Sequence, residues 1–266
     1  MAERSYKVVN GIRFENVQKI FHTPAGEEVH ALNGVNLEIE EGDFVCFIGP
    51  SGCGKSTLLR ILAGLDKPTE GTVYLNEKEI KGPGYERGLV FQDPNLFPWL
   101  NIKDNIAFAL KTRHIYKENK ASVKDFIEMV GLKGFEKSYP HQLSGGMCQR
   151  AAIARALVGR PKALLLDEPL GALDAFTRMN MQDELLKIHK EENMTMVMVT
   201  HDVDEAVYLA NKIVVMSARP AKIEEIINVE LSYPRDRNNS EFIRYRSRIL
   251  KVLDFAGKEK EPEYNI

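Results

Sequence analysis

The chain has 266 residues, 44% of them hydrophobic and 28% charged, as expected of a soluble protein with one domain or two small ones. A formal net charge of −2 and a pI of about 6.3 exclude any electrostatic basis for binding nucleic acid. No apolar run approaches the roughly 18 residues of a membrane span, the N-terminus lacks a signal-peptide core, and the three cysteines form no metal or disulfide pattern, so we expect a cytosolic protein.

The first predicted elements are two strands, 11–21 and 34–42, which alternate apolar and polar residues as half-buried antiparallel strands do. The next segment, 43–49, is continuously apolar and leads through a glycine loop into a helical run that begins at Lys55. This order is the strand–loop–helix unit of a parallel sheet. Two further short strands are predicted, at 72–76 and 88–92.

From 101 to 158 the pattern is helical and contains no convincing strand. A buried strand is predicted at 162–168, and a long helix follows it to about residue 192. The last alternating segments are a strand, a helix and a strand, at 194–201, 202–212 and 213–217. A parallel α/β core interrupted by an all-helical insertion is the simplest interpretation.

The segment 240–257 is predicted to be an amphipathic helix. Its apolar side chains lie on one helical face, at Phe242, Tyr245, Ile249, Val252 and Leu253. Because such a stripe usually contacts a core, we expect this tail helix to pack against the rest of the protein.

The segment "GPSGCGKST" matches the phosphate-loop (P-loop) pattern G-x-x-x-x-G-K-[ST]. Its glycines let successive backbone amides point inward at phosphates, and the helix that follows adds its positive N-terminal end. Lys55 supplies a charge, and the Ser56 hydroxyl is a suitable ligand for Mg²⁺. We expect the phosphates to contact the whole loop, namely Gly49, Pro50, Ser51, Gly52, Cys53, Gly54, Lys55, Ser56 and Thr57.

The segment "ALLLDEP" ends a buried strand with two adjacent carboxylates, Asp167 and Glu168. Ligands of parallel sheets gather at this edge. Side chains alternate along a strand, so one carboxylate can hold Mg²⁺ through water while the other polarises the attacking water. The alternative is that both carboxylates only solvate the end of a strand.

Two more polar side chains stand at predicted strand ends. His201 precedes a helix capped by Asp202, and its place at the phosphate edge favours a functional role over a structural one. Gln92 closes another strand, where its amide oxygen can reach a metal or a water. The alternative for Gln92 is a buried, satisfied side chain.

The segment "QLSGGMCQR" forms a second phosphate-type turn, with Ser144, Gly145 and Gly146 before a helix but no lysine. With this turn, the sequence resembles the ATP-binding cassette (ABC) ATPases from Phe21 to about residue 217. The segments that carry the resemblance are the P-loop, Gln92, "LSGGM" at 143–147, "LLLDEP" at 164–169, "GALD" at 171–174 and "TH" at 200–201. The LSGG signature is far more specific than the P-loop, which other NTPases share.

The resemblance implies an α/β fold with a P-loop NTPase (RecA-like) core, an N-terminal antiparallel β subdomain and an inserted helical subdomain. The boundaries expected from it are 11–235 for the ATPase domain (core 11–92 and 159–235, helical subdomain 93–158) and 236–266 for the tail.

The resemblance also implies ATP and Mg²⁺ and assigns roles to side chains. Glu168 is the general base, Asp167 and Gln92 belong with Ser56 to the Mg²⁺ shell, and His201 meets the γ-phosphate. Phe21, where the family more commonly has Tyr, stacks on adenine. The signature residues Ser144, Gly145, Gly146 and Met147, and Asp174 of "GALD", are counted among the nucleotide-binding residues.

The chain contains one P-loop, one signature and no internal repeat, so each is expected to be half of a site. In a head-to-tail homodimer, Ser144 and the amides of Gly145 and Gly146 would cap the γ-phosphate held by Lys55 of the partner subunit. Two ATP molecules would then join the subunits, and hydrolysis would release them.

The segments "FPWL", "SARPAKI" and "PRDR" resemble the nitrate, sulfonate and taurine uptake group of the family. This implies an importer subunit on the cytoplasmic face of the membrane, with two transmembrane permease subunits and a solute-binding protein as partners. Trp99 lies in the segment that would receive the permease, although local packing of the loop is an equal alternative. The other functions considered are the ATPase of an exporter or lipoprotein-release system, a soluble ABC protein acting on DNA or ribosomes, and a nucleotide-binding regulator without turnover.

Overall fold

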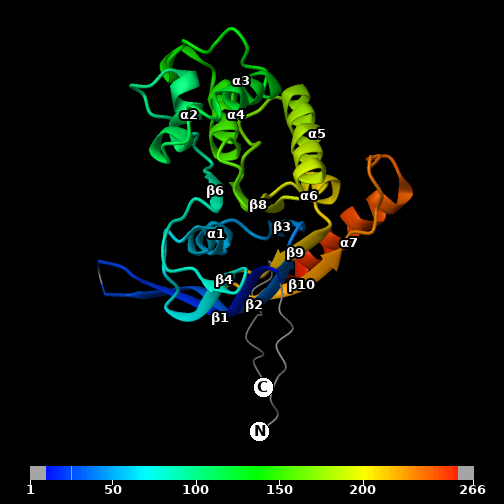
Figure 1. The fold of residues 1–266 in the computed structure, drawn as a ribbon. Helices are drawn as coiled ribbons and strands as arrows, with labels where there is room; N and C mark the ends of the chain where they lie inside the picture. Colours follow the sequence, from blue (N-terminus) through cyan, green and yellow to red (C-terminus); the bar gives the residue numbers. More distant parts are fainter. Residues whose placement is uncertain (1–9, 25, 257–266) are drawn as a thin grey trace, which may run out of the picture. The chain divides into compact units, whose positions relative to one another are not determined.

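The computed structural model describes residues 10–24 and 26–256 (Figure 1). The chain forms two compact units: the first ends at Pro83 and resumes at Val199, and the second spans Gly84–Met198. Among the described residues, no helix is both long and apolar enough to span a membrane.

The first unit begins with an antiparallel sheet of strand order β2-β1-β4-β5. The long hairpin of β1 (Gly11–His22) and β2 (Glu28–Glu40) is its main part. β4 (Glu70–Leu75) pairs with the other edge of β1, and the two-residue β5 (Lys78–Glu79) pairs with β4. The predicted alternation is confirmed over 12–17 and 35–40, where the apolar side chains are buried and the polar ones between them are not.

The first unit also holds strands of the second sheet, in the order β10-β9-β3. β3 (Phe44–Ile48) runs parallel to β9 (Lys212–Met216), and β10 (Ile223–Asn228) pairs antiparallel with β9. The helices of this unit are α1 (Lys55–Ala63), α6 (Val203–Leu209) and α7 (Ser240–Ala256). Figure 1 shows α7 beside β9 and β10, in agreement with contacts between them.

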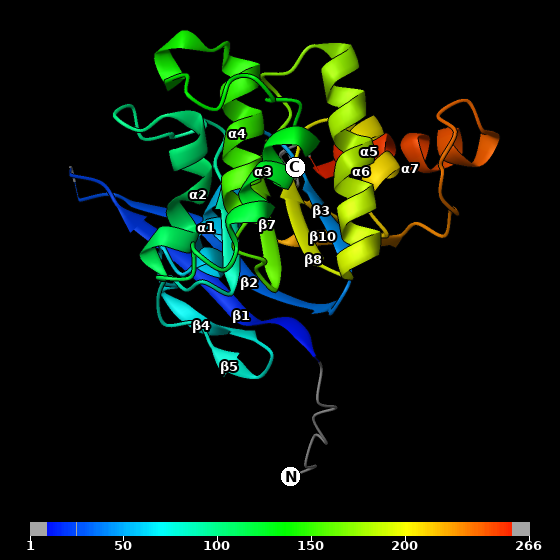
Figure 2. The same cartoon turned by 45° about the horizontal axis from the view of Figure 1, so that its top comes forward.

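The second unit contains strands in the order β8-β7-β6, with β6 (Arg87–Val90) parallel to β7 (Ala163–Asp167). β8 (Thr195–Val199) ends where the first unit resumes. Figure 2 shows α2, α3 and α4 grouped together, and each pair of them is in contact. The helices of this unit are α2 (Ile102–Thr112), α3 (Lys120–Met129), the 3₁₀ turn η1 (Pro140–Gln142), α4 (Gly145–Leu157) and α5 (Ala175–Glu192).

The predicted fold class and the helical character of the insertion are confirmed, because the structure assigns no strand between residues 91 and 162. Several boundaries differ from the sequence prediction. β2 begins six residues before residue 34, because it continues through the hairpin opposite the end of β1. β6 ends at Val90, so Gln92 lies in the loop after the strand instead of closing it.

The tail helix packs as its pattern predicts. Phe242 and Ile249 are fully buried, and α7 contacts α6, β9 and β10. Arg235, before the helix, is buried and donates to the backbone oxygens of Val207 and Ala210 at 2.6 and 2.7 Å. The end of the tail, 257–266, lies outside the described residues, and the predicted domain boundaries stay predictions.

Candidate nucleotide site

The P-loop connects β3 to α1 in the first unit, in the local context that the sequence predicts. Gly52 and Gly54 have φ angles of +70° and +124°, which side-chain-bearing residues rarely adopt. At Gly54, a Cβ atom would also lie 2.9 Å from the carbonyl oxygen of Ala31 on β2. The loop therefore needs glycine at these positions for its own backbone path.

Lys55 folds back over the loop that precedes it and is only 6% exposed. Its Nζ donates to the carbonyl oxygens of Gly49 and Pro50, at 2.8 and 2.9 Å, and lies 3.9 Å from the Sγ atom of the buried Cys53. These acceptors are uncharged carbonyls, which hold the ammonium group without neutralising it. The loop therefore has a positive charge fixed on it, as a phosphate cradle requires.

Two other predicted site residues belong to the first unit. Phe21, near the end of β1, is 40% exposed, and the ammonium of Lys19 lies 4.9 Å from the centre of its ring. His201 follows β8 and is exposed. The residue before it, Thr200, donates its amide to the carbonyl oxygen of Phe47 at the end of β3. Phe21 is thus partly exposed, with a cation over its ring, and His201 is placed at a strand end as expected.

The predicted acidic pair belongs to the second unit. Asp167 is the last residue of β7, and Glu168 follows it with a φ angle of +44°. A left-handed glutamate is uncommon, and such strained residues often occur at functional sites. Gln92 is exposed, and its Nε2 atom donates to Oε2 of Glu168 at 3.2 Å. The structure therefore brings Gln92 to Glu168, and the alternative of a buried, satisfied glutamine is wrong.

The signature turn begins α4, and Ser144 is its N-cap. The Ser144 hydroxyl accepts a hydrogen bond from the amide of Met147 at 3.3 Å. Ser144 and Gly145 are exposed, and a Cβ atom at Gly145 would meet nothing within 4 Å. At Gly146 it would lie 3.2 Å from Leu173. The space over Gly145 leaves the positive end of α4 open to an approaching group.

Asp174 is the N-cap of α5 and accepts a hydrogen bond from the amide of Thr177 at 3.0 Å. Hydrogen bonds from the Thr177 side chain, and then from its backbone amide, hold the pKa of Asp174 below its ordinary value. This carboxylate therefore has a capping function in the fold, whatever it does toward a nucleotide.

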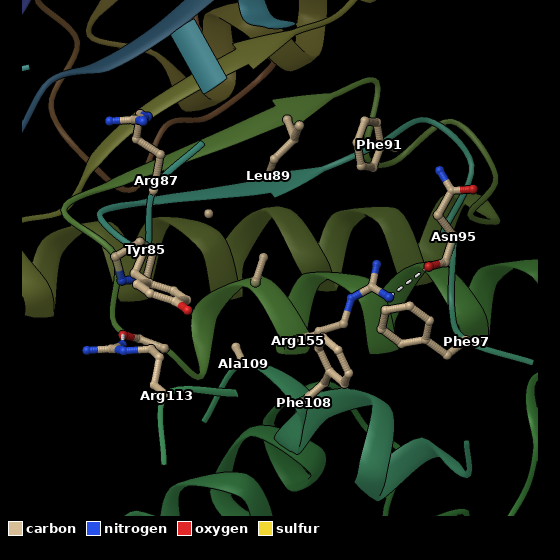
Figure 3. A pocket seen from close by; sticks show the side chains of 15 residues that line it. Tyr85, Arg87, Leu89, Phe91, Asn95, Phe97, Phe108, Ala109, Arg113 and Arg155 are labelled. Atoms are coloured by element: carbon tan, nitrogen blue, oxygen red, sulfur yellow. Dashed lines mark hydrogen bonds between the residues drawn. The ribbon is translucent and has the colours of Figure 1, made fainter. Parts of the chain in front are cut away.

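The second unit also contains a cavity of about 340 Å³ that the sequence did not predict (Figure 3). Phe97, Phe108 and Arg155 gather at one end of it, and Tyr85 and Arg113 at the other. The Phe97 and Phe108 ring centres are 4.5 Å apart, and the Arg155 guanidinium lies 5.7 Å from the Phe97 centre. The wall is thus both aromatic and basic.

Arg155 is fixed in this wall by two backbone acceptors. It donates to the carbonyl oxygens of Asn95 and Pro94, at 2.7 and 2.9 Å, in the segment that follows Gln92. Burial lowers the pKa of Arg155. In the same segment, Trp99 is 70% exposed and contacts Phe97 of the cavity wall, with the two ring centres 5.5 Å apart. Exposure to this extent argues against local packing as the reason for the tryptophan.

One contact with the P-loop has no counterpart in the predicted site. Arg219, in the loop between β9 and β10, donates to the carbonyl oxygen of Gly52. In the sequence it is visible only as part of "SARPAKI", and nothing in that segment indicates what its arginine touches.

The glycine cradle with its lysine, set between a buried parallel strand and a helix, defines a P-loop nucleotide-binding protein. The chain belongs to the ABC transporter family, because the family model with that description matches residues 32–171, more than half of the chain. It is an ABC ATPase, as the signature and the acidic strand end predict.

Named relatives match nearly the whole chain. An uncharacterized ABC transporter ATP-binding protein of Methanocaldococcus jannaschii, MJ0412, is 53% identical over 91% of this chain and 91% of its own length. The aliphatic sulfonates import ATP-binding protein SsuB of Bacillus subtilis is 47% identical, covering 90% of this chain and 92% of SsuB. The SsuB of Bacillus licheniformis is 53% identical over 84% and 87% of the two chains.

A solved structure of similar fold is the ATP-binding cassette MJ0796, described as a dimer in a post-hydrolysis state bound to ADP and Pi. Its TM-score is 0.75 at 34% identity, and the match covers 83% of this chain and 100% of that one. The predicted fold class is confirmed by this likeness.

Proposed function

We propose that this chain hydrolyses ATP to drive the import of a small sulfonate, or of a related solute of the nitrate or taurine type, through separate membrane subunits. The contact between Gln92 and Glu168 carries the hydrolytic part of the proposal, because it joins a candidate base to a candidate metal ligand. The names of the relatives support import over export. The sequence segments that resemble the uptake group support the same direction.

In the proposed reaction, the P-loop amides and Lys55 bind the β- and γ-phosphates, and Phe21 stacks on the adenine. Glu168 accepts the proton of the attacking water, and His201 donates to the γ-phosphate. Because proton transfer by a positioned base typically contributes a factor of about 10²–10⁴, Glu168 is expected to carry much of the rate.

The side chains assigned to Mg²⁺ are Ser56, Gln92 and Asp167, which offer hydroxyl, amide and carboxylate oxygens. This donor set fits magnesium, which prefers oxygen ligands and is often held by one or two carboxylates with substrate phosphates. Among the described residues there is no cluster of three or more His, Cys, Asp or Glu side chains that could hold a metal ion. When bound, the ion neutralises charge that develops on the phosphates.

The exposed signature supports a homodimer in which each subunit completes the nucleotide site of the other. Gly145 has free space above it, so the fold alone does not explain its glycine. A backbone that a ligand must approach closely does explain it. The dimer described for MJ0796 supports the homodimer.

The aromatic and basic cavity beside Trp99 supports docking of a permease on the second unit. Aromatic side chains and arginine are enriched where proteins bind one another. The cavity wall includes the segment after Gln92, so a partner seated there would contact the loop that carries a candidate site residue. This would place the chain at the cytoplasmic face of the membrane, beside a permease that receives solute from a binding protein.

The proposed function is tested by reconstituting the chain with its permease in lipid vesicles. ATP hydrolysis should rise when a binding protein loaded with an aliphatic sulfonate is added, and labelled sulfonate should enter the vesicles. Nitrate and taurine, offered in the same way, distinguish the solutes. Hydrolysis without any solute uptake would contradict the import proposal and leave the ATPase assignment standing.

Trp99→Ala should weaken co-purification of the chain with its permease by about tenfold or more, since buried interface tryptophans commonly contribute above 2 kcal/mol. The dissociation constant for ATP should not change, because Trp99 contacts Phe97 beside the cavity and is not part of the P-loop. Phe135→Ala is the matched control, an aromatic of the same unit that is 41% exposed and lies outside the segment after Gln92. Equal co-purification of both variants with the permease would contradict the docking site.

A further inference from the structure

Arg219 makes a side-chain contact with the backbone of the P-loop. Its Nη2 and Nε atoms donate to the carbonyl oxygen of Gly52, at 2.6 and 3.2 Å. We propose that Arg219 is a positioning residue of the nucleotide site, which orients the Gly52 carbonyl and thereby the loop amide that follows it. This inference rests on the proposed function, because it takes the P-loop as the part that holds the nucleotide phosphates.

The loop that presents Arg219 is itself fixed to β2. Ala221 donates its amide to the carbonyl oxygen of Ala31 at 3.0 Å, and its own carbonyl accepts from the amide of Asn33 at 3.0 Å. The same stretch of β2 passes so close to Gly54 that a Cβ atom there would lie 2.9 Å from the Ala31 carbonyl oxygen. The P-loop is therefore bounded at Gly54 by β2, and at Gly52 by an arginine whose loop is bonded to β2.

The geometry of the peptide group explains how a carbonyl contact can direct an amide. The peptide unit is planar and trans, so the carbonyl of Gly52 and the N–H of Cys53 point in opposite directions. With the carbonyl bonded to Arg219, the Cys53 amide faces the other way and donates to the carbonyl oxygen of Pro50, at 3.3 Å. Pro50 also accepts from Lys55, so this amide points to the side of the loop where the lysine lies.

A restraint is needed at this place because the residue is glycine. Gly52 has a φ angle of +70° and no side chain to limit its backbone. Without the guanidinium, the peptide that follows Gly52 can rotate and turn its amide away from the phosphate cradle. Hydrogen bonds from a charged donor are among the stronger ones, and two from one guanidinium also set direction.

The positive charge of Arg219 offers a second explanation that the experiment must separate. A permanent cation near the P-loop attracts a triphosphate even without orienting anything, but salt screens that attraction between exposed groups. The hydrogen bonds to Gly52 depend on the guanidinium fork. Arg219→Lys keeps the charge with a single donor group, and Arg219→Met removes both.

The test compares ATP binding by calorimetry, and KM and kcat for ATP hydrolysis, in the parent chain and in Arg219→Met and Arg219→Lys. For Arg219→Met we expect the dissociation constant and KM to rise about fivefold or more, with kcat at saturating ATP within about twofold. The rise should persist at about 0.5 M salt, and Arg219→Lys should recover only part of the affinity. The matched control is Arg246→Met, which loses an exposed arginine of the same unit that pairs with Asp204 and should bind like the parent.

Each other outcome overturns the proposal. If Arg219→Met binds ATP as tightly as the parent does, Arg219 has no positioning role. If Arg219→Lys recovers the full ATP affinity and salt abolishes the loss of affinity in Arg219→Met, Arg219 acts through its charge alone. If Arg219→Met does not fold, Arg219→Gln replaces it with the same expected result; failure of both to fold makes the residue structural. If the parent chain does not bind ATP, or if Lys55→Ala binds it as well as the parent does, the P-loop assignment in the proposed function fails, which is a different result.

Discussion

Glu168→Gln should lower kcat for ATP hydrolysis by a factor of about 10² to 10⁴ while leaving the dissociation constant for ATP nearly unchanged. The substituted amide has the size of the carboxylate and keeps an oxygen that can accept the hydrogen bond from Gln92, so the local geometry should survive. It cannot accept a proton from water. The measurements are phosphate release under saturating ATP and calorimetric binding of ATP.

Two variants make this result specific. Glu192→Gln removes an exposed carboxylate of α5 that pairs with Arg160 in the same unit, and it should hydrolyse ATP at the parent rate. Asp167→Asn tests the neighbouring carboxylate, which we assign to Mg²⁺. Parent-level hydrolysis in Glu168→Gln, with loss in Asp167→Asn, would exchange the two assignments. Parent-level hydrolysis in both would leave the chain without a carboxylate base at the end of β7.

The sequence predicted those parts of the fold whose signals are local. The buried strands β3, β7, β8 and β9 are continuous apolar runs, so the sequence predicts them within one or two residues of their ends. β10 was missed, because its residues, "IEEIIN", combine charges with apolar residues at a sheet edge and match no single period. The two-residue β5 is too short to carry any periodicity.

In the candidate site too, the sequence predicts contiguous segments better than contacts between distant residues. The P-loop is a contiguous segment, and its glycine angles and lysine contacts agree with its local sequence. The hydrogen bond between Gln92 and Glu168 joins residues 76 positions apart, and the one between Arg219 and Gly52 joins residues 167 positions apart. Only the family resemblance assigned Gln92, as a metal ligand, and Glu168, as the general base, to one site, and no resemblance gave Arg219 a role. Contacts of this kind depend on the path of the chain, which a periodic pattern does not contain.

The signature is a phosphate-type turn without a lysine, and its geometry supports a role toward a second subunit. Ser144 caps α4 and Gly145 has open space above it, so the positive end of the helix is accessible. In the proposed dimer, the missing charge comes from Lys55 of the partner subunit. A bulky side chain at this end of α4 should then obstruct the interface between the subunits without contacting the P-loop of its own chain.

Ser144→Arg should therefore abolish ATP-driven dimerisation and leave ATP binding by the monomer nearly intact. Light scattering with ATP, in the Glu168→Gln background, measures the dimer without loss of nucleotide. Ser144→Ala is the matched control, because it also removes the hydrogen bond to Met147, at a cost of about 1 kcal/mol in helix stability, but adds no bulk. Dimerisation that persists in Ser144→Arg would contradict a shared site. Loss of ATP binding by the Ser144→Arg monomer would instead place the signature in the nucleotide site of its own chain. Loss of the helix cap alone would not explain that result, because Lys55 stays hydrogen-bonded to the P-loop carbonyls of Gly49 and Pro50.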